Sequence, residues 1–319
     1  MYHIKLLDII CTMGERRAYC MIPPLVSYST FNRMGLTVRS LTALLKTTDD
    51  FELNIIDNNS VDDTWEYIES LTDPRIKSKI RFPINKGPIY AVNYNLSRRK
   101  PDQYFIALES DVCLYTPDWI SRFLRVFEAF PEVGLLGVPR AAPYPAYMPA
   151  VIRKEKDDVS YLQLKDGKLG VELDFIPGHC QCLRPELIDI VGYWCEECGY
   201  GDAELSVRIN NYTPYRAGFT TDITIDMLQF LPCEECTGKE RCKLDKVDTT
   251  CFSLRNARYK NESYAEEFRW KYLEYFKELK EGKRTVYCAS IHDPVSIQSY
   301  VYKIGWALEN FYYYEVNAN

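Results

Sequence analysis

The sequence predicts an α/β fold whose largely parallel sheet is covered by helices on both faces. From residue 21 to about residue 138, short apolar runs alternate with segments of helical periodicity, which is typical of βαβ units. Polar clusters follow several predicted strands, where parallel sheets bind their ligands. The 319 residues, 46% hydrophobic and 26% charged, suffice for a large core and fit an ordinary soluble protein.

The first half of the chain contains four predicted strands, each followed by a predicted helix. The strands are expected at residues 21–29, 51–56, 80–82 and 103–108. The helices are expected at residues 36–45, from residue 62 onward, at 89–96 and at 117–130. Asp63 and Glu66 lie near the start of the second helix, where the helix dipole favours acidic side chains.

The second half is less regular. An exposed hairpin is expected at residues 154–170, and strands are expected at 174–183 and 221–225. Helices are expected at residues 186–191, 202–210, 263–280 and 294–314. We predict a first domain over residues 1–228 and a second unit over residues 229–319, in which a Cys-rich insertion and C-terminal helices pack on the first domain.

Charge and hydropathy narrow the functional classes. A net charge of −6 argues against a generic nucleic-acid binder, although nucleic acid is not excluded as an acceptor. The sequence has no run of about eighteen apolar residues, so no transmembrane segment is expected. Glu15, Arg16 and Arg17 interrupt the apolar N-terminal stretch, which argues against a signal peptide. We therefore expect a cytoplasmic protein.

An acidic pair follows the fourth predicted strand. Because alternate residues of a strand face the same side, Glu109 and Asp111 are expected to point together, with Ser110 turned away. Two like charges at the mouth of a sheet are costly unless a positive charge lies between them, and a divalent cation is the commonest solution. The alternative is a solvated strand end before a turn at residues 115–118.

Polar residues also follow the second and third strands. The carboxylate of Asp57 can accept a hydrogen bond from the imide N–H of a uracil, or it can cap the following turn. The turn Asn85-Lys86-Gly87 and the amide of Asn93 can shape a nucleotide pocket. Each motif alone is weak evidence for a nucleotide site, and the order of the motifs along the chain is the stronger evidence.

From about residue 25 to residue 227 the chain resembles the family 2 glycosyltransferases with the GT-A fold, a Rossmann-like, mostly parallel mixed sheet flanked by helices. The matching segments are Ser29-Thr30-Phe31-Asn32-Arg33, Ile55-Ile56-Asp57-Asn58-Asn59-Ser60, Asn85-Lys86-Gly87 and Glu109-Ser110-Asp111, the last standing where the family carries Asp-x-Asp. The resemblance implies a nucleotide-sugar donor, and we expect a UDP-sugar. Pattern and resemblance together assign donor binding to Thr30, Asn32, Arg33, Asp57, Asn59, Lys86, Gly87, Asn93, Glu109 and Ser110.

The resemblance continues beyond the sheet. Residues 176–180 resemble the segment that lines the sugar and acceptor side, and residues 199–208 resemble the family's acidic helix, with Gly201 in place of the first acid. Asp202 matches the base of inverting members, and Glu204 is the next acid. The resemblance implies transfer to an acceptor hydroxyl with inversion, while Asp202 removes the hydroxyl proton. The alternatives are a helix N-cap for Asp202 and an exposed surface position for Glu204.

The resemblance also implies a catalytic Mn²⁺ or Mg²⁺ on the donor diphosphate, with Asp111 as a ligand. A His or an acid after the acidic helix often adds a ligand in GT-A enzymes. His292 and Asp226 are the candidates here, although a lone His in a turn is more often structural.

Twelve cysteines are many for a cytosolic chain of this length. Cys233, Cys236, Cys242 and Cys251 lie within about twenty residues, and their leading Cys-x-x-Cys spacing predicts a structural Zn²⁺ site, with an iron–sulfur cluster as the weaker alternative. In a secreted protein the same residues would form disulfides. Cys195 and Cys198 form a second Cys-x-x-Cys, which either completes a different four-thiolate set or is unrelated.

Two other functions compete with a glycosyltransferase. A nucleotidyltransferase also uses paired acids over a parallel sheet, but it usually carries a Gly-rich, basic phosphate loop early in the chain, which this sequence lacks. A second alternative is a non-catalytic binding module on a decayed transferase scaffold. It is favoured by two departures from the family pattern, Glu109 in place of an Asp and Gly201 in place of an acid. The sequence leaves the donor sugar and the class of acceptor open.

Overall fold

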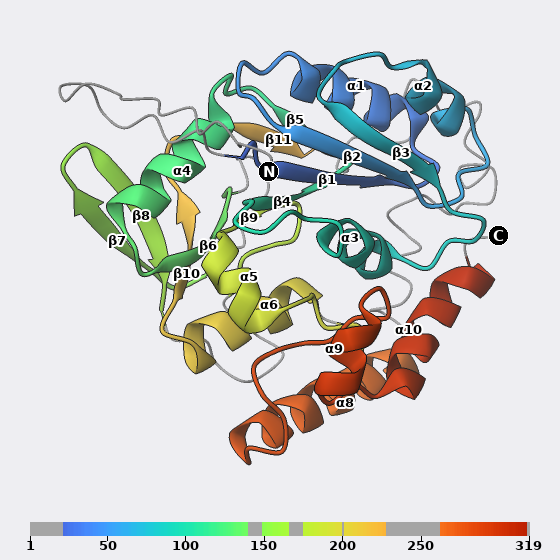
Figure 1. Ribbon diagram of the computed structural model, residues 1–319, viewed down its shortest axis with the longest axis vertical. Coiled ribbons are helices and arrows are strands. Elements are labelled where there is room, and N and C mark those ends of the chain that lie inside the picture. Colours follow the sequence, from blue (N-terminus) through green and yellow to red (C-terminus); the bar gives the residue numbers. More distant parts are fainter. Residues whose placement is uncertain (1–21, 140–148, 166–174, 200, 228–261, 318–319) are drawn as a thin grey trace, which may run out of the picture.

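The computed structural model describes residues 22–139, 149–165, 175–199, 201–227 and 262–317. A nine-stranded sheet with the order β3-β2-β1-β4-β9-β6-β10-β8-β7 forms its centre (Figure 1). The strands are β1 (Leu25–Thr30), β2 (Glu52–Asp57), β3 (Ile76–Arg81), β4 (Phe105–Glu109), β6 (Val133–Gly137), β7 (Val151–Lys156), β8 (Val159–Leu164), β9 (Cys180–Leu183) and β10 (Arg216–Thr220). Neighbouring strands are parallel except where β8 or β9 takes part, which confirms the mostly parallel mixed sheet.

Helices cover both faces of the sheet, as the alternation predicts (Figure 1). They are α1 (Met34–Leu45), α2 (Thr64–Ser70), α3 (Pro88–Leu96), α4 (Trp119–Ala129), α5 (Pro185–Val191), α6 (Gly201–Tyr212), α8 (Glu262–Lys280), α9 (Pro294–Ser299) and α10 (Ile304–Asn317). Side chains of α1, α2 and α4 share one apolar core with the sheet, and those of α3, α5 and α6 share another. Within the described ranges, no helix combines the length and apolar character needed to cross a bilayer.

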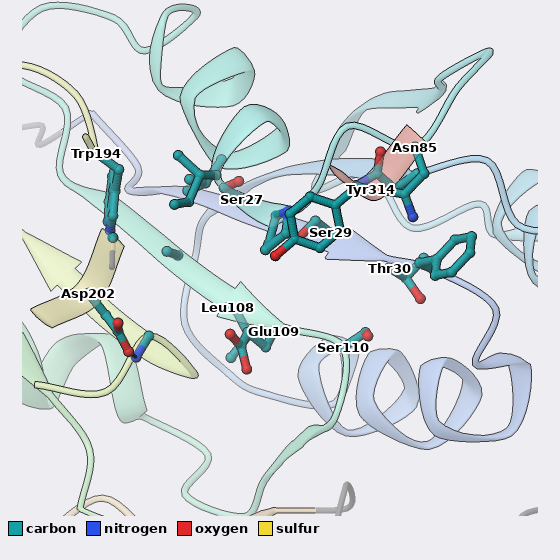
Figure 2. A pocket seen from close by; sticks show the side chains of 18 of the residues that line it. Ser27, Ser29, Thr30, Asn85, Leu108, Glu109, Ser110, Trp194, Asp202 and Tyr314 are labelled. Carbon is teal, nitrogen blue, oxygen red and sulfur yellow. Dashed lines mark hydrogen bonds between the residues drawn. The ribbon is translucent and has the colours of Figure 1, made fainter. Parts of the chain in front are cut away.

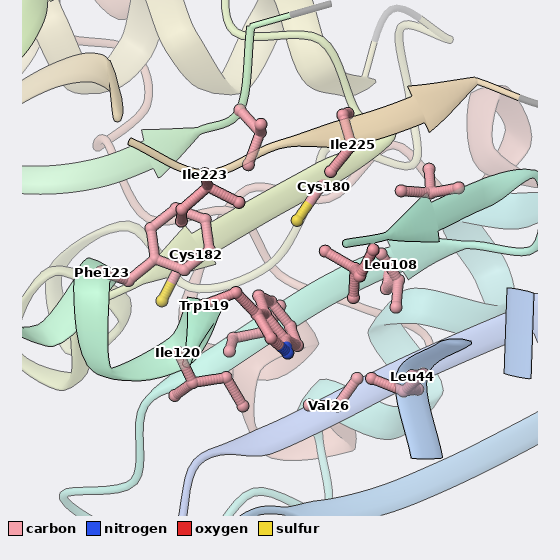
Figure 3. Packing of buried hydrophobic residues seen from close by; sticks show 14 of the residues in the cluster. Val26, Leu44, Leu108, Trp119, Ile120, Phe123, Cys180, Cys182, Ile223 and Ile225 are labelled. Atoms are coloured by element: carbon pink, nitrogen blue, oxygen red, sulfur yellow. The ribbon is translucent and has the colours of Figure 1, made fainter. Parts of the chain in front are cut away.

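The alternation of side chains along β4 decides which way the acidic pair faces. Ile106 and Leu108 enter the core under α1 and α4, which Figure 3 shows around Trp119. Phe105 and Ala107 enter the opposite core, on the side of α3 and α6. Because alternate residues share a face, Glu109 at the end of the strand points to the α3 and α6 side.

Two predictions about strand ends are wrong. Strand β4 ends at Glu109, and a turn at residues 110–111 leads into β5 (Val112–Leu114), so the alternation that would turn Ser110 away from its neighbours does not continue. The strand predicted at 221–225 is a bend followed by β11 (Ile225–Met227), because β11 leaves the main sheet to pair with β5 in a small antiparallel sheet. Asp226 therefore lies inside a strand rather than at its end.

The C-terminal helix α8 packs against α6, whereas the division of the chain at residue 228 stays a prediction. Apolar side chains of α8 share a buried cluster with α6. The single helix predicted at 294–314 is in fact α9 and α10, separated by an extended break. Buried acids hold that break, since the hydroxyl of Tyr302 donates to Glu196 at 2.6 Å and the N–H of Lys303 donates to Glu197 at 3.0 Å.

Removal of the Glu197 carboxylate is expected to destabilise the fold strongly. Both oxygens of Glu197 accept from the guanidinium of Arg284 at 3.1 Å, and both side chains are at most 4% exposed. Arg284 keeps an ion pair with Glu278 at 2.9 Å, so Glu197→Ala leaves the buried guanidinium only partly compensated and should lower the free energy of unfolding by about 2 kcal/mol in urea titrations. Asp158→Ala, which removes an exposed pair with Arg125, should cost under about 1 kcal/mol. Equal losses in the two variants would contradict the structural role of the Glu197–Arg284 pair.

Candidate active site

A cavity of about 230 Å³ opens at the carboxyl ends of β1 and β4 (Figure 2). Its floor comes from these two strands, and its walls come from the start of α3, the segment before β9, the start of α6 and the end of α10. The cavity lies where parallel sheets bind ligands, as predicted. Six of the predicted site residues line it, namely Thr30, Arg33, Glu109, Ser110, Asp111 and Asp202.

Glu109 and Asp202 face the same point in the cavity. The backbone N–H of Gly178 donates to Oδ2 of Asp202 at 3.0 Å. A Cβ atom built on Gly178 would lie 3.6 Å from Oδ2 of Asp202 and 3.6 Å from Oε1 of Glu109. Figure 2 shows the carboxylates of Glu109 and Asp202 on the same side of the cavity. Asp202 also lies in the first turn of α6. The cavity thus contains an oriented carboxylate close to a second one.

Asp111 combines one neutralised oxygen with one open oxygen. Nη1 of Arg33 lies 2.8 Å from Oδ2 of Asp111, whose side chain is 3% exposed. Oδ1 of the same carboxylate is buried and has no hydrogen-bond partner among the described residues. A buried carboxylate oxygen without a partner is costly, and hard divalent cations such as Mn²⁺ and Mg²⁺ bind such oxygens. The residues present therefore fit a divalent cation beside Asp111.

Asp57 and Asn32 stabilise the turns beneath the cavity through hydrogen bonds, and neither residue lines the cavity. Asp57 is fully buried and accepts from the backbone N–H and the hydroxyl of Ser60, with Nε of Arg81 at 3.4 Å. The same Ser60 hydroxyl accepts from the N–H of Asn32 at 2.8 Å. Burial raises the pKa of the Asp57 carboxyl, while its bonds to Ser60 and the charge of Arg81 oppose this shift. Two roles were considered for Asp57, binding of a uracil and capping of the following turn. Its contacts with Ser60 are those of a turn cap.

The other predicted donor residues lie around the cavity. Asn59 follows Asp57 in a left-handed conformation, with φ of 67°. The ammonium of Lys86 lies 5.1 Å from the centre of the Tyr90 ring. Gly87 has φ of 87°, and the ring of Tyr314 lies where a Cβ atom of Gly87 would be. No other residue type fits that contact.

Asn93 shapes the wall indirectly. It is fully buried, donates to the carbonyl of Trp194 at 2.9 Å and accepts from the N–H of Trp194 at 3.0 Å. Trp194 in turn lines the cavity, so the predicted buried amide positions a wall of the pocket.

Three predicted residues lie away from the cavity. Glu204 is fully buried against Arg208, so it is not on an exposed surface either. Asp226 pairs across β11 and β5 with Cys113. Nε2 of His292 lies 3.0 Å from the carbonyl oxygen of Tyr90, and its ring packs edge-on against Tyr90. Cys233, Cys236, Cys242 and Cys251 lie outside the described residues.

The half-buried His292 should make stability depend on pH. Burial lowers its pKa to about 4, below the ordinary value of 6.5. Between these values the unfolded chain binds a proton that the native protein does not, so stability should be complete above pH 6.5 and fall as the pH drops toward 4. The loss should approach about 2 kcal/mol, allowing for partial exposure. Urea titrations at pH 7.5 and pH 4.5 should show a larger pH effect in the wild type than in His292→Gln, and equal effects would contradict this role.

Sequence reasoning missed several residues that line the cavity. Gln181, Trp194, Tyr313, Tyr314 and Asn317 contribute to its wall. The run of three tyrosines at residues 312–314 was the available signal, because aromatic side chains can stack on sugars or bases. Tyr313 is in fact both buried and cavity-lining.

Comparison with known proteins identifies the family and the fold. A model of glycosyl transferase family 2 matches residues 26–189, just over half of the chain. Protein CgeD of Bacillus subtilis (strain 168) is 24% identical over 202 residues, which make up 59% of this chain and 46% of that protein. This chain thus spans less than half of the length of that relative.

Two solved structures resemble the fold. Mannosyltransferase PcManGT from Pyrobaculum calidifontis, in complex with GDP-Man and Mn²⁺, superposes with a TM-score of 0.51 at 14% identity, covering 95% of this chain and 89% of its own. GalNAc-T7, in complex with UDP, GalNAc and Mn²⁺, superposes with a TM-score of 0.51 at 13% identity, covering 82% and 56%. The GT-A fold predicted from the sequence is confirmed.

Proposed function

This chain belongs to glycosyl transferase family 2, and from that premise we propose that it transfers a sugar from a UDP-sugar to a hydroxyl group of an acceptor, with inversion at the anomeric carbon. The observation that carries this proposal is the meeting of Glu109, Asp111 and Asp202 in one cavity at the strand ends. The first two acids come from β4 and the turn after it, and the third comes from α6. This is the arrangement that a transferase needs, with diphosphate binding on one side and a base on the other.

The donor diphosphate would bind beside Asp111 and Arg33, which both line the cavity. We propose that Asp111, through its open Oδ1, and Glu109 hold Mn²⁺ or Mg²⁺ together with the diphosphate oxygens. When bound, the cation neutralises the charge that develops on the leaving diphosphate. Arg33 supplies a second positive charge, since its guanidinium can exchange Asp111 for a phosphate oxygen. The metal ion and the Arg33 guanidinium would both favour departure of the nucleoside diphosphate.

Asp202 would act as the base. The Gly178 N–H fixes Oδ2 of Asp202, and this leaves the carboxylate oriented toward the cavity. The sugar would occupy the space between Asp202 and Trp194, whose indole N–H donates to Gln181 at 3.3 Å and is thereby held in place. An acceptor hydroxyl that enters beside Asp202 loses its proton to this carboxylate as it attacks the anomeric carbon from the face opposite the diphosphate.

The nucleoside would lie toward Asn85 and Tyr314. Both side chains line the cavity at the end near Ser29 and Thr30, away from Asp202 (Figure 2). An aromatic ring and an amide suit a pyrimidine, because the ring can stack on the base and the amide can bond its edge. PcManGT contains GDP-Man, so a guanine donor is the comparison that the donor test must include.

Release of nucleoside diphosphate from a panel of sugar donors tests the proposal. UDP-, GDP-, ADP- and CDP-sugars would be incubated with the protein, with and without Mn²⁺, and hydrolysis would be followed as slow turnover onto water. We expect release of one nucleoside diphosphate, UDP, that depends on Mn²⁺. If no donor is hydrolysed and no nucleotide protects the protein in thermal-shift assays, the proposed donor site is wrong. Nucleotide protection without hydrolysis would favour the non-catalytic binding module.

A further inference from the structure

Three thiols and a carboxylate meet outside the cavity, between α6 and α8. Sγ of Cys195, Sγ of Cys288 and a carboxylate oxygen of Glu204 all lie within 4.8 Å of one another. Sγ of Cys198 lies 3.3 Å from Sγ of Cys195. All four side chains are at most 2% exposed, and the cysteines are reduced. The group takes no part in the proposed transfer reaction.

Apolar packing accounts for the three thiols but not for the carboxylate among them. The cluster around it is built from rings and aliphatic side chains of α8, such as Tyr272, Phe276 and Leu279. Within it, Glu204 accepts from Nε and Nη2 of the fully buried Arg208 at 2.7 and 3.1 Å. A buried ion pair costs several kcal/mol of desolvation per ion, and apolar side chains of similar size are often as stable. The thiols and the carboxylate therefore bring metal-ligand chemistry into one buried position.

We propose that Cys195, Cys288 and Glu204 bind a structural Zn²⁺, with Cys198 in the fourth position. Thiolates and carboxylates are the ligands that Zn²⁺ takes in tetrahedral sites. With bonds of about 2.0–2.3 Å, the ligand atoms of such a site lie roughly 3.3–3.8 Å apart, so the atoms of Cys195, Cys288 and Glu204, already within 4.8 Å of one another, need only small side-chain rotations. Each coordinating thiol gives its proton to solvent as its bond to the metal forms. The charge of Arg208 offsets part of the negative charge that the thiolates bring.

The site would join segments that are distant in the chain. Cys195 precedes α6, Glu204 lies on α6, and Cys288 follows α8. The backbone already aligns them, because the N–H of Cys288 donates to Val191 at 2.9 Å and its carbonyl accepts from Tyr193 at 3.0 Å. A metal here would fasten the C-terminal helices to the sheet domain. It would also fix α6, whose first turn carries Asp202.

A variant with serine at Cys233, Cys236, Cys242 and Cys251 separates this site from the one predicted at residues 233–251. We expect this four-serine protein, purified without added metal, to contain about one zinc per chain by elemental analysis. Its apo form should bind Co²⁺ with thiolate-to-metal charge-transfer absorption. The additional change Cys288→Ser should abolish both signals, whereas the matched control Cys113→Ser, a buried cysteine near Leu36, should keep them.

Two further readouts protect the test from a variant that fails to fold. A zinc chelator should lower the melting temperature of the four-serine protein, independently of any activity. Absence of zinc from the folded four-serine protein, or a melting temperature that the chelator does not change, would overturn the proposal. A disulfide between Cys195 and either Cys198 or Cys288, found by mass spectrometry in freshly purified protein, would also overturn it.

Discussion

Asp202→Asn is expected to lower kcat by about 10²–10⁴-fold while donor binding stays close to that of the wild type. This is the range that a positioned general base contributes, and asparagine cannot take a proton at neutral pH. The substitution keeps the shape of the side chain, and its amide oxygen can still accept from the N–H of Gly178. The loss should therefore appear in the chemical step rather than in folding. Turnover with a saturating acceptor, or donor hydrolysis until an acceptor is known, measures it.

A matched acid gives the control for Asp202. Asp222→Asn removes an exposed carboxylate that pairs with Arg122 and does not line the cavity, and it should leave kcat unchanged. A kcat for Asp202→Asn within about threefold of the wild type, with UDP binding intact, would exclude Asp202 as the base.

Asp111→Asn is expected to abolish the Mn²⁺-dependent part of UDP binding. The change removes the charge of the carboxylate whose Oδ1 is open and whose Oδ2 contacts Arg33. A metal contact to a diphosphate contributes several kcal/mol, so UDP affinity in Mn²⁺ should fall by about 100-fold and turnover should fall at least as far. Titration calorimetry with UDP, in Mn²⁺ and in EDTA, measures the two parts separately.

Comparing UDP affinity in Mn²⁺ with UDP affinity in EDTA separates the loss of the metal from an effect on the fold. In EDTA the variant should bind UDP at least as well as the wild type, because Arg33 is released from its ion pair. Equal losses of affinity in Mn²⁺ and in EDTA would mean that Asp111 acts through the fold or through Arg33 rather than through a metal.

Local sequence pattern was sufficient for the first half of the sheet and for one side of the site, whereas β6 and β10 were not predicted. The apolar runs that become β1 and β4 carry their own periodicity, and their polar ends place Thr30 and Glu109 at one edge of the sheet. The break after Glu109 was not predictable in the same way. It arises because β5 pairs with β11, more than a hundred residues away along the chain. The end of β4 is therefore set by the pairing of β5 with a strand that is distant in the sequence.

The remaining part of the site depends on contacts between distant segments. Trp194 reaches the cavity because the buried Asn93 holds its backbone, and Tyr314 reaches it because Gly87 leaves room for the ring. Neither contact has a local pattern. The same limit applies to Glu204, which follows Asp202 by two residues on α6 and yet turns into the buried cluster with Arg208. On a helix, residues two apart do not share a face.

The most direct test of the account is the position of Mn²⁺ in crystals of the protein grown with UDP and Mn²⁺. Anomalous scattering locates the ion independently of the atomic model. We predict one strong peak within bonding distance of Oδ1 of Asp111, shared with oxygens of the diphosphate, with the base toward Asn85 and Tyr314. A nucleotide bound elsewhere, or bound in this cavity with no peak at Asp111, would contradict the proposed donor site.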